Sequence, residues 1–111
     1  MIIITTTFDI QGYRIVEYRG IVRGLIVRSP TIVQGWMGGL KNLVGGNIGA
    51  FTKMCETARK QAFDSLIEHG KELGANAIVG MRYDASQIAA ERFSATEILC
   101  YGTAVIIEQL K

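Results

Sequence analysis

In residues 97–108, Glu-Ile-Leu-Cys-Tyr-Gly-Thr-Ala-Val-Ile-Ile-Glu, ten uncharged residues stand between two glutamates. Because side chains alternate between the two faces of a strand, the even-numbered residues from Ile98 to Ile106 share one face and the odd-numbered residues from Leu99 to Ile107 share the other. Both faces are apolar, and a strand of this kind is normally covered on both sides. The stretch therefore predicts a central strand with packing on each face.

Three stretches before it are expected to complete a sheet of at least four strands, because they are rich in β-branched residues or alternate in polarity: 2–8, 13–28 and 76–83. The second is either one long strand bent at Gly20 and Gly24 or two strands. A polar connection over 84–96 is expected to join the third strand to the last.

A long amphipathic helix is expected after Gly49, with apolar residues three and four positions apart: Phe51, Met54, Cys55, Ala58, Ala62, Leu66 and Leu73. Glu56 stands four residues before Lys60, which favours an ion pair, and Gly74 is typical of the residue that ends a helix. A short helix over 32–44 is also predicted, weakened by its three glycines.

These elements predict a two-layer α/β (α+β) subunit with an antiparallel or mixed sheet. One helix of about 24 residues, about 36 Å long, covers only one face of such a sheet. The other face is apolar as well and needs a cover. A second copy of the chain is the expected cover, since closed cyclic oligomers bury such faces and join sheet edges into a shared barrel.

The length and composition predict a single domain over 1–111. They also predict a cytoplasmic protein with reduced cysteines. The chain has 12 Lys and Arg against 10 Asp and Glu, a net charge of +2, so neither nucleic acid nor an anionic membrane is an expected partner. The longest uncharged stretch, 29–40, is too short and too rich in Gly and Pro for a membrane helix. Residues 1–8 carry no Lys or Arg of an export signal, and two cysteines do not make a disulfide framework.

Five blocks of the chain resemble the YbjQ-like family, small uncharacterised proteins labelled as heavy-metal-binding: 15–22, 44–50, 73–80, 80–85 and 102–105. The resemblance covers nearly the whole chain. It implies a dodecin-like subunit that assembles into a ring, a homopentamer around a barrel, with no established reaction. Arg19 stands where some relatives have Cys, so one thiol that would support the metal label is missing.

The candidate metal ligands are Cys55, His69 and Cys100, because thiolate and imidazole suit soft and borderline ions. Cys55 and His69 are fourteen residues apart, about 21 Å along one helix, so only contacts between subunits could bring them to one ion. Both cysteines have apolar neighbours in the pattern, where a thiol usually packs as a small hydrophobic group. His69 is expected to be a partly exposed helix residue.

A second candidate site is the glycine-rich segment with Gly45, Gly46, Asn47 and Gly49, which opens the long helix. Unpaired amides at a helix start can hold a phosphate or carboxylate. The segment lacks the glycine spacing of dinucleotide-binding loops and the Lys-Ser/Thr of nucleotide-triphosphate loops. The alternative is a structural turn in which Asn47 caps the helix.

Three functions are open at this point. The leading one is a non-enzymatic homo-oligomer that binds a small ligand or an ion in the shared barrel or the subunit clefts, with no cofactor identified. The second is an enzyme with a site between subunits, where Glu17, Asp84 or Glu97 would be the general base. These carboxylates would otherwise be solvated or paired, Glu17 with Arg14 or Arg19 across strands. The third is a purely structural oligomer.

Overall fold

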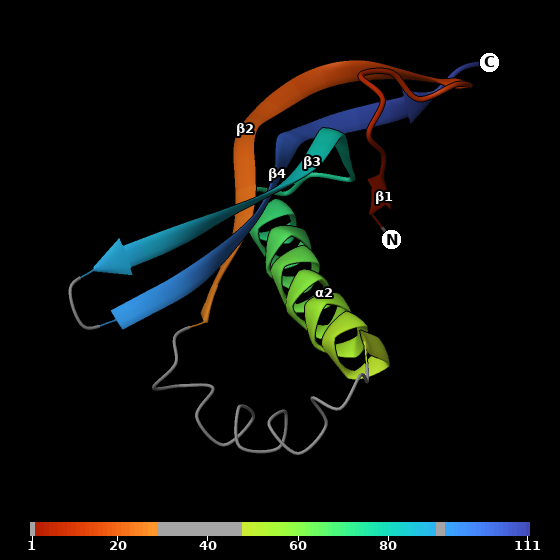
Figure 1. Ribbon diagram of the computed structural model, residues 1–111. Helices are drawn as coiled ribbons and strands as arrows, with labels where there is room; N and C mark the ends of the chain where they lie inside the picture. The colour runs from red at the N-terminus through yellow and green to blue at the C-terminus, as the bar shows by residue number, and fades with distance from the viewer. Residues whose placement is uncertain (1, 29–47, 91–92) are drawn as a thin grey trace.

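The computed structural model describes residues 2–28, 48–90 and 93–111 of the chain. The elements in these ranges are five: β1 (Ile3–Ile4), β2 (Tyr13–Arg28), α2 (Ile48–Glu72), β3 (Ala77–Ala90) and β4 (Phe93–Gln109) (Figure 1). The four strands form one sheet in the order β1-β3-β4-β2. β1 runs parallel to β3, and the other pairs are antiparallel. The predicted α+β architecture with a mixed sheet is confirmed, while the helix expected over 32–44 falls outside the described residues.

The longest strand pairing in the sheet joins β2 and β4. It runs from the pair Tyr13 and Gln109 to the pair Arg28 and Thr96, so 13–28 forms one strand rather than two. Its register shifts lie between Ile15 and Gly20, and Gly20 has the positive φ of 121° that a side chain disfavours. The ladder passes Gly24, the other expected bend, without a shift.

Two strand predictions are corrected. The first strand is limited to Ile3–Ile4 instead of 2–8. Backbone hydrogen bonds still join Thr5 and Thr7 to residues 78–81, but they do not continue the regular ladder, because Gly80 has a positive φ of 64° at this point of β3. The expected connection over 84–96 is instead the end of a hairpin, in which β3 continues to Ala90 and β4 begins at Phe93. The polar side chains of Asp84, Ser86 and Gln87 are exposed, and the antiparallel ladder with β4 extends the strand past them.

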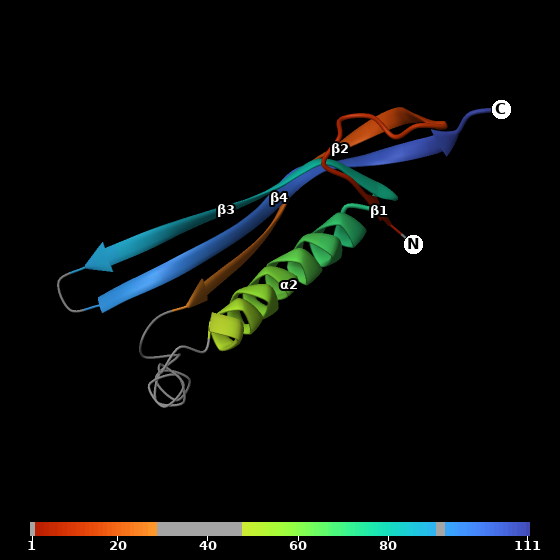
Figure 2. The same ribbon diagram turned by 45° about the vertical axis from the view of Figure 1, so that its right-hand side comes forward.

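Helix α2 packs along one face of the sheet, mainly on β2 and β4 (Figure 2). The core below it is formed by seven buried residues: Val22, Ala62, Leu66, Ala75, Ile78, Cys100 and Ala104. Gly24 lets the helix approach, since a Cβ there would overlap the carbonyl oxygen of Ala62 and lie 2.7 Å from the amide nitrogen of Leu66. The missing side chain of Gly24 thus sets the distance between helix and sheet.

The helix ends as its sequence predicts. Gly74 has a φ of 75°, and its amide donates to the carbonyl of Lys71 at 3.0 Å. The guanidinium of Arg19 donates to the Leu73 carbonyl at 2.7 Å, which ties the helix end to β2. Lys60 was expected to pair with Glu56. Its ammonium instead contacts the carboxylate of Asp64, one turn later in the helix, at 2.9 Å.

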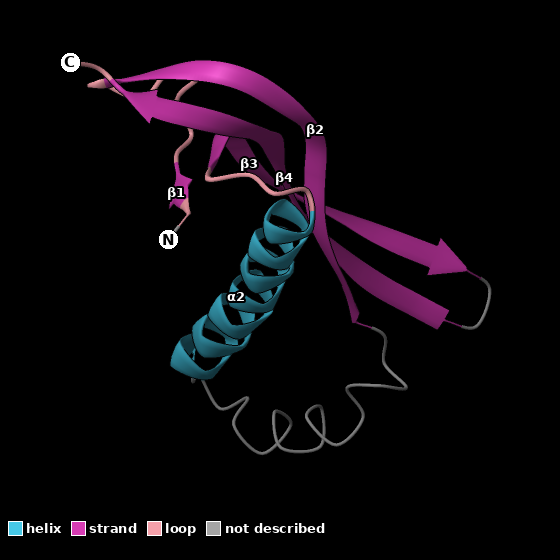
Figure 3. Cartoon of the chain, turned by 180° about the vertical axis from the view of Figure 1, so that it is seen from behind, coloured by secondary structure: helices cyan, strands magenta, loops and turns pink. Residues whose placement is uncertain are grey.

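A second, smaller core lies on the opposite face of the sheet, at the end where both termini lie (Figure 3). Its buried residues are Ala77, Val79, Val105 and Ile107. The side chain of Asn76 bridges both backbone groups of Ile107, donating to its carbonyl at 3.0 Å and accepting from its amide at 2.7 Å. This clasp fixes the start of β3 to β4. The second core does not extend to the far end of the same face within the described residues.

Candidate functional site

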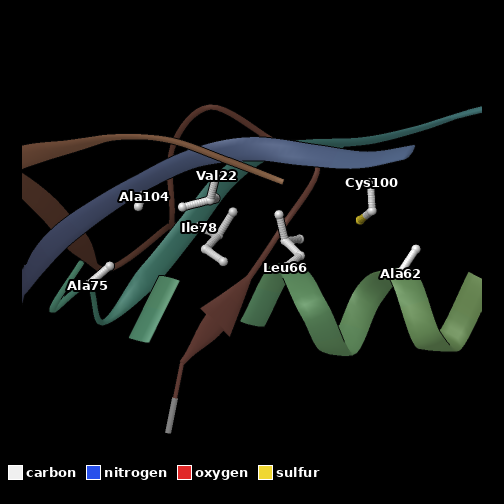
Figure 4. Close-up of a cluster of buried hydrophobic side chains, with 7 residues drawn as sticks. All are labelled: Val22, Ala62, Leu66, Ala75, Ile78, Cys100 and Ala104. Carbon is white, nitrogen blue, oxygen red and sulfur yellow. The ribbon is translucent and has the colours of Figure 1, made fainter. Parts of the chain in front are cut away.

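Cys100 is fully buried beneath α2, beside Ala62 and Leu66 (Figure 4). This burial raises the pKa of its thiol to about 11. A neutral thiol among aliphatic side chains is a poor metal ligand, since the thiolate is the form that binds. The structure therefore supports the alternative reading of Cys100 as a small hydrophobic residue.

His69 is half-buried and faces β2. Its Nδ1 accepts a hydrogen bond from the backbone amide of Arg23 at 3.1 Å. Because an amide can only donate, Nδ1 holds the lone pair and Nε2 carries the proton. A neutral imidazole that bound a metal through Nε2 would need its proton on Nδ1, so metal binding would break this contact.

The three metal candidates do not converge. Cys55 lies on α2 with its side chain outside the described part, and His69 is fourteen residues further along the same helix. Cys100 packs on Ala62, about two turns before His69. Within 2–28, 48–90 and 93–111, no three His, Cys, Asp or Glu side chains gather closely enough to hold an ion. The donors of one described subunit do not fit a metal centre.

The glycine-rich candidate is placed only in part. Gly45, Gly46 and Asn47 fall outside the described residues, so the anion site and the capping role of Asn47 both stay predictions. Gly49 is the second residue of α2, which begins at Ile48.

The three carboxylates proposed as general bases have separate surroundings. Glu17 pairs with Arg19 at 3.0 Å on the same strand, whereas Arg14 pairs across strands with Glu108 at 3.4 Å. The carboxylate of Asp84 accepts the amide of Ala85. Glu97 lies on β4, two residues from the partner of Asp84, so the two are diagonal neighbours on the face opposite the helix.

A cleft lies between α2 and β3, with a volume of about 530 Å³. It is lined by Glu56, Thr57, Arg59, Lys60, Phe63 and Tyr83, and we call it the α2–β3 cleft. The guanidinium carbon of Arg59 lies 6.0 Å from the centre of the Tyr83 ring. This site was not predicted from the sequence. One signal for its helical wall was present, because Arg59 and Phe63 are four residues apart and so lie on the same side of the predicted helix.

A second concave surface lies on α2 itself, with a volume of about 340 Å³. Its lining is mostly acidic: Asp64, Ser65, Glu68, His69 and Glu72. The lone pair on Nδ1 of His69 is already bonded to the backbone amide of Arg23. This surface is a solvated helix face.

On the side opposite the helix, no other element of the described ranges 2–28, 48–90 and 93–111 covers the distal part of the sheet. The strand register places six large side chains there, which we call the open apolar face: Tyr18, Ile21, Leu25, Val27, Leu99 and Tyr101. Ile21 is 77% exposed and Leu25 48% exposed. The radius of gyration is 17.5 Å, against about 13 Å for a compact chain of this length. No helix among the described residues is long and apolar enough to cross a membrane.

These features define a small α+β protein with one helix-covered sheet face and one open apolar face. Residues 2–108 match the YbjQ_1 family, described as "Putative heavy-metal-binding", and the chain belongs to this family. UPF0145 proteins are close relatives. One from Legionella pneumophila strain Lens is 58% identical, covering 96% of this chain and 98% of its own, and one from Francisella tularensis is 52% identical, covering 94% and 98%.

The fold has a counterpart among solved structures. A crystal structure of a DUF74-family protein of unknown function from Pediococcus pentosaceus superposes with a TM-score of 0.62, over 96% of this chain and 98% of that one. Its sequence identity is 16%, so the likeness concerns the fold.

Proposed function

We propose that this protein is the subunit of a cytoplasmic homo-oligomer that binds a small ligand, and that copies of the chain cover one another's open apolar faces. The observation that carries the proposal is that face, which exposes Ile21, Leu25 and Tyr101 around Arg23 on β2 and β4. Exposed apolar patches of this kind are characteristic of interaction sites.

The sheet edges support self-association. The sheet order leaves two strand edges without a partner strand in the described part of the chain: the outer edge of β2, and the outer edge of β3 beyond Met81, the last residue that bonds to Thr5. Unpaired edges attract further strands. A β2 edge that meets the β3 edge of the next copy is a head-to-tail contact, and such contacts close into rings. A homopentamer around a shared barrel, as the family resemblance implies, is one such ring.

Sedimentation of the Ile21→Glu variant tests the assembly. A carboxylate at position 21 would have to lose its water when another copy covers the open apolar face, and only the exposed Arg23, two residues further along β2, could offset that cost. We therefore expect the variant to sediment as a smaller species than the wild type at micromolar concentration. Leu110→Glu is the matched control, because Leu110 is an exposed apolar residue beyond the end of β4. A wild-type chain that sediments as a monomer would refute the proposal.

The heavy-metal description of the family has less support from this chain. Cys100 is buried and neutral, and the Nδ1 of His69 is occupied by the Arg23 amide. A small organic ligand fits the described surface better, because the α2–β3 cleft offers both charged and aromatic side chains.

A further inference from the structure

The α2–β3 cleft has the size of a small-molecule site. Its volume of about 530 Å³ lies in the range of roughly 300 to 1,000 Å³ that ligand pockets occupy. Its two aromatic residues come from different elements, Phe63 from α2 and Tyr83 from β3. Phe63 packs on the core below the helix, and Tyr83 is 44% exposed. A planar molecule can therefore contact a ring from the helix and a ring from the sheet.

Of the two cations that line the cleft, Arg59 is the one without an ion pair among the described residues. The ammonium of Lys60 contacts the carboxylate of Asp64 at 2.9 Å. Arg59 has no ion pair with any residue in the described ranges, and its guanidinium lies over the Tyr83 ring. A guanidinium on an aromatic ring can still bind a carboxylate through its N–H groups.

The remaining groups limit the charge of the ligand. Glu56 lines the same cleft, and its carboxylate repels a second negative charge. Burial and then the neighbouring Cys100 raise the pKa of Tyr83 above its ordinary value, so its phenol is neutral at pH 7. The aromatic wall therefore does not repel an anion.

We propose that the α2–β3 cleft binds a small planar aromatic monoanion, with its ring between Phe63 and Tyr83 and its carboxylate on Arg59. This assignment names the ligand class for the small-ligand function above and rests on it. All the lining residues belong to one chain, so the cleft does not need a second copy to be complete. Ligand binding and self-association can therefore be tested by separate experiments.

Isothermal titration calorimetry with naphthalene-2-carboxylate on the assembled wild-type protein tests the assignment. We expect saturable binding that weakens about tenfold in Arg59→Gln, because a charge-assisted contact is lost. Tyr83→Leu should weaken it comparably, whereas Tyr83→Phe should keep it, since only the ring face is used. Arg14→Gln is the matched control, because it removes the same charge from an exposed site outside the cleft.

A neutral probe of the same shape, naphthalene-2-methanol, should bind about tenfold more weakly than the carboxylate and respond little to Arg59→Gln. The proposal is overturned if the wild type does not bind the carboxylate, if Arg59→Gln binds it as well as the wild type does, or if both probes bind equally. Sedimentation of the same Arg59→Gln sample should give the wild-type mass. A monomeric wild type that still binds the probe would refute the assembly and leave the cleft assignment intact.

Discussion

Replacing Gly24 by alanine puts a methyl group at the closest approach of helix and sheet. The added Cβ would overlap the Ala62 carbonyl oxygen and lie 2.7 Å from the Leu66 nitrogen, where nonbonded carbon contacts need about 3.5 Å. Both obstacles are helix backbone, so no side-chain rotation relieves them. The helix must move away by about 1 Å, which loosens the packing of Leu66 on Val22 and Cys100.

We expect Gly24→Ala to lower the free energy of unfolding by about 3 kcal/mol or more, at the upper end for added core volume, and to lower the Tm by about 12 °C or more. Gly70→Ala is the matched control. Its added methyl lies 3.0 Å from the Cδ1 of Ile78, a flexible end, and alanine improves helix propensity, so the net change should stay within about 1 kcal/mol.

Urea unfolding and thermal melting, both followed by circular dichroism, measure the two variants at one protein concentration, because self-association would add to stability. A Gly24→Ala protein that melts within about 2 °C of the wild type would refute the inferred distance between α2 and β2.

Three further outcomes follow from the core and the candidate ligands. Asn76→Ala should cost about 2 kcal/mol in urea unfolding, because both backbone groups of Ile107 lose their partner, while Gln11→Ala in an exposed turn should be near neutral; equal stability of the two would contradict the clasp. The thiol of Cys100 keeps its proton to about pH 11 when folded but releases it near pH 9 when unfolded, so its contribution to stability is fully present below pH 9 and is lost between pH 9 and 11. Urea unfolding across this window should show a decline that is smaller in Cys100→Ala, and parallel curves would count against a buried neutral thiol. Elemental analysis of protein purified without chelators should find the same zinc, copper and nickel in Cys100→Ala as in the wild type, and loss of a stoichiometric ion would restore Cys100 as a ligand.

The sequence predicted the helix and the last strand well, for local reasons. Apolar spacing along α2 and the glycine at position 74 are properties of neighbouring residues, and the ten uncharged residues before Glu108 need no knowledge of the rest of the fold. The prediction of 84–96 as a connection was wrong because polarity was taken for irregular structure. In this hairpin, the partner strand supplies the order, and Asp84 and Gln87 are simply its exposed side chains.

The surroundings of the candidate site residues depend on contacts between distant parts of the chain, which a local sequence pattern does not show. The expectation that Cys100 packs as a small hydrophobic residue rested only on its apolar sequence neighbours, and the side chain is buried in the structure. The bond from Arg23 to His69 and the position of Arg59 over Tyr83 join residues 46 and 24 positions apart. Such pairs follow from the order of the strands, and the parallel pairing of β1 with β3 was not visible in the sequence.

The pairing of β2 with β4 also sets an order of events during synthesis. Arg28 ends β2, and its partner strand begins at Phe93, 65 residues later (93 minus 28). At roughly 5 to 20 residues per second, a ribosome takes about 3 to 13 s to make that interval. Until that strand is made, β2 lacks its ladder, and until α2 is complete, 44 residues after Arg28 (72 minus 28), Val22 lacks the cover that buries it in the folded subunit. We therefore expect the translation speed of the message between codons 28 and 93 to affect how much of this protein reaches its native state.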